Sequence, residues 1–212
     1  MNKSNAIIYI VDDDPSIRKS LNRLLSSSGY CAETFSSADE FIESNLESSE
    51  LACLILDVKM PGVTGFELQE KLLSVNSSLP VIFISGHGDI PSSVKAIKKG
   101  AVDFLAKPFN ETDLLKAIEE ALEKYSNSKI EIDEKKAIQK RLDKLTEREY
   151  EIFTYVLTGM FNKNIAAELN ISEKTVKVHR GRVMDKLNVD SVAALVNLAN
   201  KIGIKPVEVG NN

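Results

Sequence analysis

The feature that most constrains the fold of this chain is an alternation, repeated five times before residue 123, between short apolar runs and helical patterns. The apolar runs are AIIYIV, YCAETF, LACLIL, PVIFIS and DFLA. In the first helical pattern, Ile17, Leu21, Leu24 and Leu25 fall on one stripe of a helix. Strands that are apolar along nearly their whole length belong to parallel sheets with helices on both faces. The sequence therefore predicts a doubly wound α/β sandwich with a five-stranded parallel sheet over residues 1–122.

Polar residues at the starts of several helical patterns predict where those helices begin. Asp14 stands before Pro15, which is typical of an N-cap followed by proline at the first helical position. A Ser or Thr with Glu three residues later predicts a capping box, in which each residue's side chain bonds the other's backbone N–H. Three such pairs stand at predicted helix starts: Ser37 with Glu40, Thr64 with Glu67, and Thr146 with Glu149.

The chain changes character after residue 122. Residues 123–143 are polar and charged with a weak apolar stripe, so we expect a partly helical linker. Residues 144–212 predict four short helices, and the three-residue turn NIS between two of them is helix-turn-helix spacing. The net charge of −4 divides into −7 for residues 1–125 and +3 for residues 126–212. This asymmetry indicates two modules with different partners.

The composition favours a cytoplasmic protein. The first apolar run meets an acidic cluster after six residues, so we predict neither a signal peptide nor a membrane span. Cys31 and Cys53 lie in strand-like runs without metal-ligand partners nearby, and we expect both to be reduced thiols in the core.

Polar residues stand at the ends of four predicted strands: Asp12 and Asp13, Asp57, Ser85, and Lys107. In a doubly wound sheet these ends meet at one rim, where ligands bind. Carboxylates held together there repel one another unless a cation neutralises them, and Mg²⁺ prefers a few carboxylates plus water. A single strand-end Asp usually forms a cap or a turn, but this combination favours a site of phosphoryl transfer. Asp57, alone on the central strand, is the predicted nucleophile.

The motifs VDDDP, LDVKMPGVTG, ISGHGD and AVDFLAKPF resemble the receiver domain of two-component response regulators over nearly all of residues 5–122. The resemblance implies that a sensor histidine kinase phosphorylates Asp57. It also implies that Mg²⁺ is bound directly by Asp13, Asp57 and the Lys59 carbonyl, and by Asp12 through water. Ser85 would be the switch hydroxyl, Phe104 the rotating aromatic switch, and the Lys107–Pro108 bond would be cis. His87, between two glycines, is more typical of a loop residue than of a phosphorylation role.

The segment EKTVKVHRGRVMDKL predicts a helix with two distinct faces. Val176, Val183 and Leu187 share the buried side, whereas the opposite side is cationic. Such a helix suits the major groove of DNA, where lysines contact bases or phosphates and Val178 can contact a thymine methyl. The predicted DNA contacts are Asn162, Lys163, Lys174, Thr175, Lys177, Val178, Gly181 and Arg182.

Residues 145–189 also resemble the four-helix DNA-binding domain of the LuxR type, so the whole chain is similar to the NarL/FixJ family. By this resemblance Lys177 and Val178 reach bases, and Gly181 occupies a position where some relatives carry a lysine. Two alternatives stay open. His179 either packs or contacts a phosphate, and the last helix, around Val192, Leu195 and Ala199, forms either a dimer contact or core.

Together these features predict a phosphorylation-switched transcription regulator that binds double-stranded DNA as a homodimer. The resemblance favours activation, with RNA polymerase as a partner, and no enzyme activity beyond phosphotransfer and dephosphorylation at Asp57. The main alternative is a regulator that works without phosphorylation and carries a vestigial receiver. An aspartyl phosphatase is disfavoured because Lys59 stands where such an enzyme needs a second aspartate.

Overall fold

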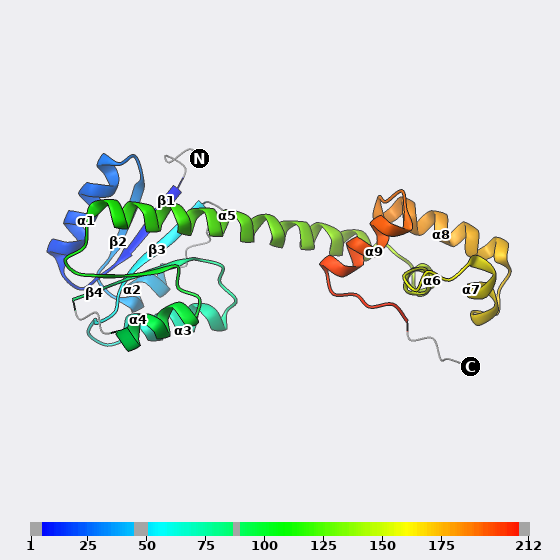
Figure 1. Cartoon of the computed structure of the whole chain (residues 1–212), viewed down its shortest axis with the longest axis horizontal. Helices are drawn as coiled ribbons and strands as arrows, with labels where there is room; N and C mark the ends of the chain where they lie inside the picture. Colours follow the sequence, from blue (N-terminus) through cyan, green and yellow to red (C-terminus); the bar gives the residue numbers. More distant parts are fainter. Residues whose placement is uncertain (1–5, 45–50, 87–89, 208–212) are drawn as a thin grey trace. The chain divides into compact units, whose positions relative to one another are not determined.

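The computed structural model describes residues 6–44, 51–86 and 90–207 (Figure 1). The chain divides into two compact units, Met1–Lys129 and Ile130–Asn212, called here the N-terminal and C-terminal units.

The N-terminal unit is built on a five-stranded parallel sheet, as predicted. The strands are β1 (Ala6–Val11), β2 (Cys31–Phe35), β3 (Leu51–Asp57), β4 (Val81–Ser85) and β5 (Asp103–Ala106), in the order β2-β1-β3-β4-β5. The chain leaves β1 toward β2 and then crosses to β3 on the other side, so the strand order reverses at β1. The carboxyl ends of β1 and β3 therefore flank the crevice where doubly wound sheets bind ligands.

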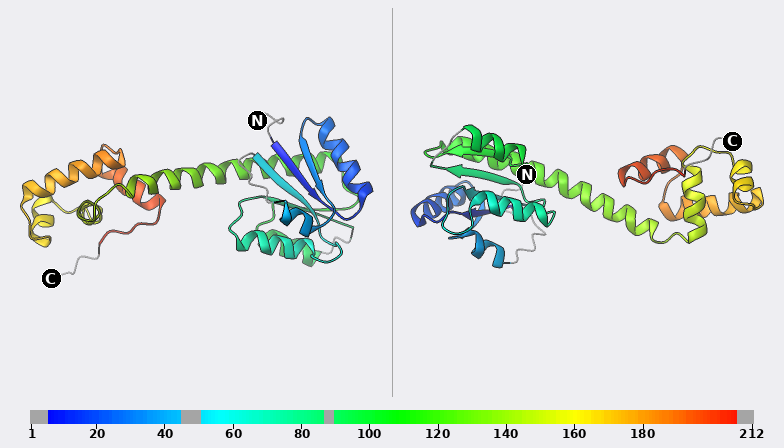
Figure 2. Two further views of the ribbon diagram at one scale, coloured as in Figure 1. Left: turned by 180° about the vertical axis from the view of Figure 1, so that it is seen from behind. Right: turned by 90° about the horizontal axis from the view of Figure 1, so that it is seen from below.

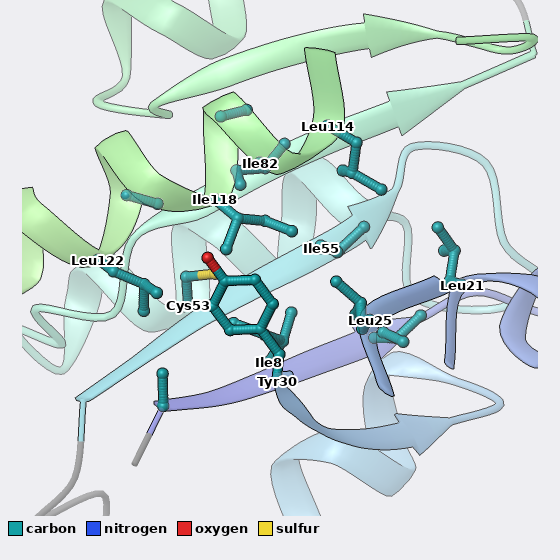
Figure 3. Close-up of a cluster of buried hydrophobic side chains, with 14 of the residues drawn as sticks. Ile8, Leu21, Leu25, Tyr30, Cys53, Ile55, Ile82, Leu114, Ile118 and Leu122 are labelled. Atoms are coloured by element: carbon teal, nitrogen blue, oxygen red, sulfur yellow. The ribbon is translucent and has the colours of Figure 1, made fainter. Parts of the chain in front are cut away.

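Helices cover both faces of this sheet (Figure 2). They are α1 (Pro15–Ser27), α2 (Ala38–Glu43), α3 (Gly65–Ser74), α4 (Ile90–Lys98) and the first part of α5 (Glu111–Leu142). Alternate residues of each strand enter different cores: Ile8 and Ile10 join α1 and α5 (Figure 3), whereas Tyr9 and Val11 join α2, α3 and α4. Burial on both faces is the reason that these strands are almost continuously apolar.

The helix starts agree with their capping signals at three of four places. Asp14 caps α1 before Pro15, and both halves of the capping box are present for Thr64 with Glu67 in α3. The same holds for Thr146 with Glu149 in the C-terminal unit. The box predicted at α2 is wrong: Ser37 accepts from the Glu40 N–H, but the Glu40 carboxylate bonds the N–H and hydroxyl of Ser36.

The prediction of two core cysteines is half wrong. Cys53 is fully buried in β3, but Cys31 is exposed. The physical reason is that β2 lies at the edge of the sheet, where most of its side chains are left outside the core.

The C-terminal unit is a small helical domain with one core. Its elements are the end of α5, then α6 (Glu147–Val156), α7 (Asn162–Glu168), α8 (Glu173–Leu187) and α9 (Val192–Lys201). Residues 123–143 were predicted as a partly helical linker; all of them except Asp143 are helical and belong to the 32-residue α5. The last turns of α5 bring Ile138 and Leu142 into the C-terminal core. Within the described ranges, no helix has a stretch long and apolar enough to cross a membrane.

Candidate functional site: an acidic strand-end cluster and a cationic helix

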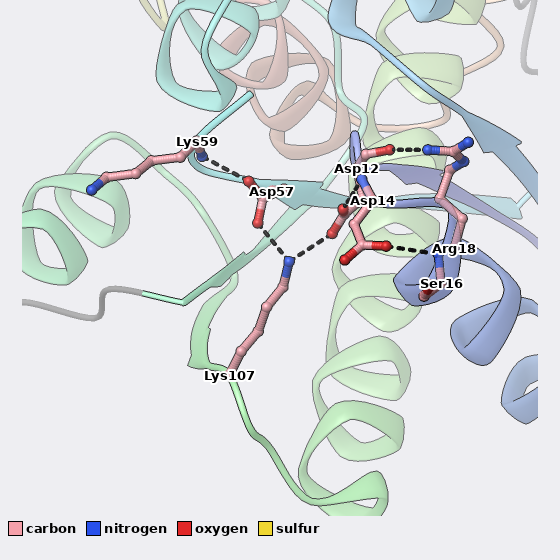
Figure 4. Close-up of polar contacts among 7 residues, drawn as sticks. All are labelled: Asp12, Asp14, Ser16, Arg18, Asp57, Lys59 and Lys107. Atoms are coloured by element: carbon pink, nitrogen blue, oxygen red, sulfur yellow. Dashed lines mark hydrogen bonds and ion pairs between the residues drawn. The ribbon is translucent and has the colours of Figure 1, made fainter. Parts of the chain in front are cut away.

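The carboxyl ends of three strands bring an aspartate pair and a lysine together in the N-terminal unit (Figure 4). Asp57 ends β3, and Asp12 and Lys107 directly follow β1 and β5. Lys107 Nζ donates to Asp12 Oδ2 and to Asp57 Oδ1, each at 2.7 Å. Both carboxylates are buried, with exposed fractions of 1% for Asp12 and 5% for Asp57. The predicted convergence of these three residues is therefore present.

Backbone contacts fix both carboxylates in place. The Lys59 N–H donates to the second oxygen of Asp57 at 2.8 Å, and the Asp14 N–H donates to Asp12 Oδ1 at 2.9 Å. Arg18, which sequence reasoning missed, donates from Nη1 to the Asp12 carbonyl at 2.7 Å. No sequence pattern pointed to Arg18, because its partner is a backbone atom.

Gly65 is a second residue that sequence reasoning missed, and its lack of a side chain allows α3 to lie close to Asp57 at the end of β3. Its N–H donates to the Val58 carbonyl at 3.1 Å, and a Cβ on Gly65 would lie 2.2 Å from the Asp57 carbonyl oxygen. Any side chain there would push α3 away from β3. The sequence did contain a signal for this close approach. Gly65 directly follows the N-cap Thr64, and a glycine is not required at the first position of a helix.

The electrostatics of the cluster are those of two carboxylates that share one cation. Burial raises the pKa of Asp57, the hydrogen bond from Lys107 works against this shift, and the nearby charge of Asp12 adds to it. Burial disfavours the charged form of Lys107, but its hydrogen bonds to Asp12 and Asp57 outweigh burial and raise its pKa. The cluster can therefore accept further positive charge, because two buried acids face a single lysine.

The donor atoms of the cluster suit a hard cation such as Mg²⁺, which prefers carboxylate and carbonyl oxygens. The structure brings Asp12 and Asp57 together, but Asp13 is exposed. Over the described residues, no group of three or more His, Cys, Asp or Glu side chains is gathered closely enough to hold a metal. Two of the predicted carboxylates thus converge, and Lys107 lies between them.

The remaining predicted receiver residues lie close by in the sheet. Ser85 ends β4 and is buried, with its carbonyl accepting from the Lys107 N–H at 2.7 Å. Phe104 on β5 is half-buried, and its ring centroid is 6.2 Å from that of Phe83. The predicted cis bond between Lys107 and Pro108 is confirmed. His87 lies outside the described residues.

Helix α8 has the two faces that its sequence predicts. Val176, Val183 and Leu187 are buried in the C-terminal core. Five of the residues predicted to contact DNA on this helix are exposed: Lys174, Lys177, Val178, Gly181 and Arg182. The sixth, Thr175, is half-buried, and its N–H donates to the hydroxyl of the capping Ser172 at 3.1 Å. A cationic surface with the exposed apolar Val178 in it is thus available to a partner.

Beside α8, the start of α7 holds the other two predicted contacts, Asn162 and Lys163. Asn162 is not independent of α8, because its Oδ1 accepts from Arg180 Nη1 at 2.9 Å. Arg180 is not among the predicted contacts, and nothing in its sequence pattern pointed to Asn162.

The structure bears on the two questions that the sequence left open, the role of His179 and the role of the last helix. His179 is half-buried, and its Nδ1 has no hydrogen-bond partner within the described part of the chain. On α9, Leu195 and Ala199 are buried in the core of their own domain, whereas Val192 is half-buried.

Comparison with known proteins gives two family matches. The family described as "Response regulator receiver domain" matches residues 8–119, and "Bacterial regulatory proteins, luxR family" matches residues 143–199. The chain is 44% identical to "Response regulator protein TmoT" of Ectopseudomonas mendocina, covering 95% of this chain and 91% of that one. It is 39% identical to "Transcriptional regulatory protein FixJ" of Rhizobium meliloti, covering 94% and 97%.

Solved structures agree with these matches. The response regulator StyR is 43% identical with a TM-score of 0.81, covering 93% of this chain and 99% of that one. Full-length FixJ from B. japonicum is 38% identical with a TM-score of 0.56, covering 93% and 97%.

Proposed function

The chain is a two-component response regulator of the NarL/FixJ family, with a receiver domain and a LuxR-type DNA-binding domain, and we propose that phosphorylation of Asp57 switches its action as a transcription regulator. The observation that carries this proposal is the buried pair Asp12 and Asp57 held on Lys107. We assign residues 1–122 to the receiver, 123–143 to a linker and 144–212 to the DNA-binding domain.

In the proposed reaction, a carboxylate oxygen of Asp57 attacks the phosphorus of a phosphohistidine on the sensor kinase. The oxygen–phosphorus bond forms as the phosphorus–nitrogen bond breaks, and the histidine leaves with the bonding electrons. Lys107 and the Ser85 hydroxyl then bind phosphoryl oxygens, which stabilises the charge that phosphoryl transfer concentrates there. Bound Mg²⁺ would neutralise part of that charge, with Asp13, Asp57 and the Lys59 carbonyl as direct ligands and Asp12 acting through water. Lys107 holds both buried carboxylates in readiness.

Phosphorylation would promote formation of a homodimer through α4 and β5. Three apolar residues on one side of α4 support this surface: Ile90, Val94 and Ile97 are 78%, 46% and 45% exposed. They are spaced i, i+4 and i+7, so they form one stripe. Phe104 on neighbouring β5 links this surface to the site, because its ring can respond to a movement of Ser85.

A homodimer presents two copies of α8 to the two halves of a two-fold operator in double-stranded DNA. We assign base contacts to Lys177 and Val178. We assign DNA-backbone contacts to the surrounding residues Lys163, Lys174, Thr175 and Arg182, with Asn162 beside them at the start of α7. Gly181 presents only its own peptide backbone to the groove. Transcription activation through RNA polymerase rests on the family resemblance.

The competing possibility is a regulator whose receiver no longer takes a phosphoryl group. The two buried carboxylates favour the phosphorylated regulator. Burying two acids costs desolvation energy, and a receiver without a function at this site would have no reason to retain them.

The test is labelling with radioactive acetyl phosphate, with and without Mg²⁺. We expect wild type to be labelled only with Mg²⁺ and Asp57→Asn not to be labelled. Asp39→Asn, which removes an exposed carboxylate on α2, is the matched control and should be labelled normally. Labelling of Asp57→Asn at the wild-type level would overturn the assignment.

The DNA part is tested by selecting duplexes from a random pool with phosphorylated wild type and with Asp57→Asn treated identically. Enrichment of one two-fold motif by the phosphorylated protein alone is expected. Equal enrichment by both proteins would favour the vestigial receiver.

A further inference from the structure

A hollow of about 610 Å³ lies beside α8, between it and the start of α7. Its lining includes Asn162, Lys163 and Arg180. We propose that Arg180 is a DNA-backbone contact, that Asn162 acts by holding it in position, and that the hollow receives a phosphate of the strand that flanks α8. This inference rests on the proposed DNA-binding function and deepens it.

The contact between Arg180 and Asn162 orients a guanidinium group without neutralising it. Arg180 Nη1 donates to Asn162 Oδ1 at 2.9 Å, and that oxygen is a neutral amide acceptor. A guanidinium has five N–H donors in a rigid planar fork that matches a phosphate, so four remain for another partner. Arg180 is thus fixed in direction while most of its donors and all of its charge stay available.

Two lysines of the C-terminal unit, by contrast, are neutralised by carboxylates. Lys186 forms an ion pair with Glu149, and Lys201 forms one with Glu134, both at 2.6 Å. For Arg180, no carboxylate within the described ranges lies at ion-pair distance, although Glu173 lines the same hollow. A half-buried, oriented and unneutralised guanidinium is more costly than a solvated one, and a bound anion would offset that cost.

The position of Arg180 on α8 suits a phosphate better than a base. At 100° per residue, Arg180 lies about 60° around the helix from Lys177, between the exposed face and the buried stripe. A helix in the major groove presents its central face to base edges and its flanks to the backbones that border the groove. Lys163 lines the same hollow and adds a second cation on this flank.

Asn162 has a different role here from the direct phosphate contact that its sequence position suggested. Its side-chain oxygen is already used by Arg180. Asn162 is therefore a positioning residue, whose effect on DNA binding should depend on the presence of Arg180.

The experiment measures binding of the full-length phosphorylated protein by fluorescence anisotropy at several KCl concentrations. The probes are a 30-base-pair duplex selected by wild type and a shuffled duplex of the same composition. Arg180→Ala should weaken binding to both roughly tenfold, and should reduce the slope of log affinity against log salt by about 0.9 per protomer. Asn162→Ala should have a smaller effect alone and no effect in the Arg180→Ala background. Arg23→Ala, which removes an exposed arginine from α1, is the matched control and should change neither quantity.

Each outcome decides a specific point. Wild-type affinity and slope in Arg180→Ala would overturn the proposal, and a loss confined to the selected duplex would assign Arg180 to a base. A full further loss from Asn162→Ala in the Arg180→Ala background would overturn the positioning role. Thermal melting reports whether each variant is folded, and Arg180→Lys, which should keep most of the salt slope, provides a second variant. If phosphorylated wild type enriches no duplex from the random pool, the proposed DNA-binding function fails as well.

Discussion

Each unit contains a buried carboxylate held by a lysine, and the pKa values of the two carboxylates are shifted in opposite directions. Asp57 in the N-terminal unit is 5% exposed and lies 2.7 Å from Lys107. Glu149 in the C-terminal unit is 3% exposed and lies 2.6 Å from Lys186. Burial raises the pKa of Asp57, whereas the hydrogen bond from Lys186 lowers the pKa of Glu149 to about 2.

The difference comes from the partners that each carboxylate shares. Among the residues that the structure describes, Lys186 pairs with no acid other than Glu149. Glu149 also accepts a hydrogen bond from the Thr146 N–H of its capping box at 2.9 Å. Asp57 divides Lys107 with Asp12, so its charge is only partly compensated. A carboxylate whose charge is fully compensated by a cation stabilises the fold. A carboxylate that shares its cation with another acid can still bind a metal ion or accept a phosphoryl group.

The largest expected difference between the two pairs is in phosphorylation. Lys107→Met should slow labelling by acetyl phosphate at least about a hundredfold, equivalent to about 2.7 kcal/mol in the barrier, because the charge on the phosphoryl oxygens loses its lysine. Lys186→Met should leave the labelling rate unchanged. Equal effects of the two substitutions on the rate would erase the distinction between the pairs.

The second effect concerns the packing around Asp57. Gly65→Ala should destabilise the N-terminal unit by about 2–3 kcal/mol, because its Cβ cannot fit 2.2 Å from the Asp57 carbonyl oxygen. Hydrogen exchange of peptides from β3 measures this loss locally, and peptides from α6 serve as the internal control. Protection of β3 that matches wild type would show that α3 moves away at no cost.

The third effect is the pH dependence of the Glu149 pair. Because the pKa of Glu149 is lowered to about 2, the pair's stabilisation is present above the ordinary value near 4.5 and is lost as the pH falls toward 2. We expect Glu149→Gln to cost about 2 kcal/mol at pH 6, less than the full shift implies because Lys186 is about one-third exposed. The cost should vanish near pH 2. Urea unfolding of both proteins at pH 6, 4 and 2.5 measures it, and a pH-independent difference would contradict the assignment.

The fourth effect has the opposite sign. The pKa of Asp57 is raised, so its ionisation opposes folding: the cost grows as the pH rises from the ordinary value of this carboxyl to the raised pKa, and it is complete above that pKa. Asp57→Asn removes one of the two acids that share Lys107 and should stabilise the N-terminal unit by about 1 kcal/mol at pH 7. The gain should shrink in acid, as hydrogen exchange of β3 can show. A loss of stability at pH 7 would mean that Lys107 compensates both carboxylates fully.

The sequence could predict the features that follow from its local pattern of apolar and polar residues. The parallel sheet and its rim were predictable because apolar runs that alternate with helices admit few arrangements, and polar strand ends then converge. Cys31 was mispredicted because a strand's own residues do not show that it lies at the sheet edge. The continuity of α5 was missed because residues 123–137 are charged, with too weak an apolar stripe to indicate a helix.

Contacts between distant residues were the hardest to predict. Arg180 and Asn162 are 18 positions apart and meet only after α7 and α8 pack. Asp13 neighbours Asp12 in the sequence, yet the two side chains differ completely in burial. The sequence shows which residue types are present, whereas the direction of each side chain depends on the packed structure.

The smallest effect concerns Gly181, which differs from Gly65 because there is open space where its side chain would be. Gly181 lies inside α8, its φ is not in the left-handed region, and a Cβ there would have no neighbour within 4 Å. Gly181→Ala should therefore stabilise the C-terminal unit by about 0.5–1 kcal/mol, since alanine loses less conformational entropy in a helix. Thermal melting and hydrogen exchange of α8 peptides measure this gain. A protein that is more stable but binds its selected duplex more weakly would indicate that Gly181 permits close approach of the DNA to α8. Unchanged stability would instead contradict the open space beside this residue.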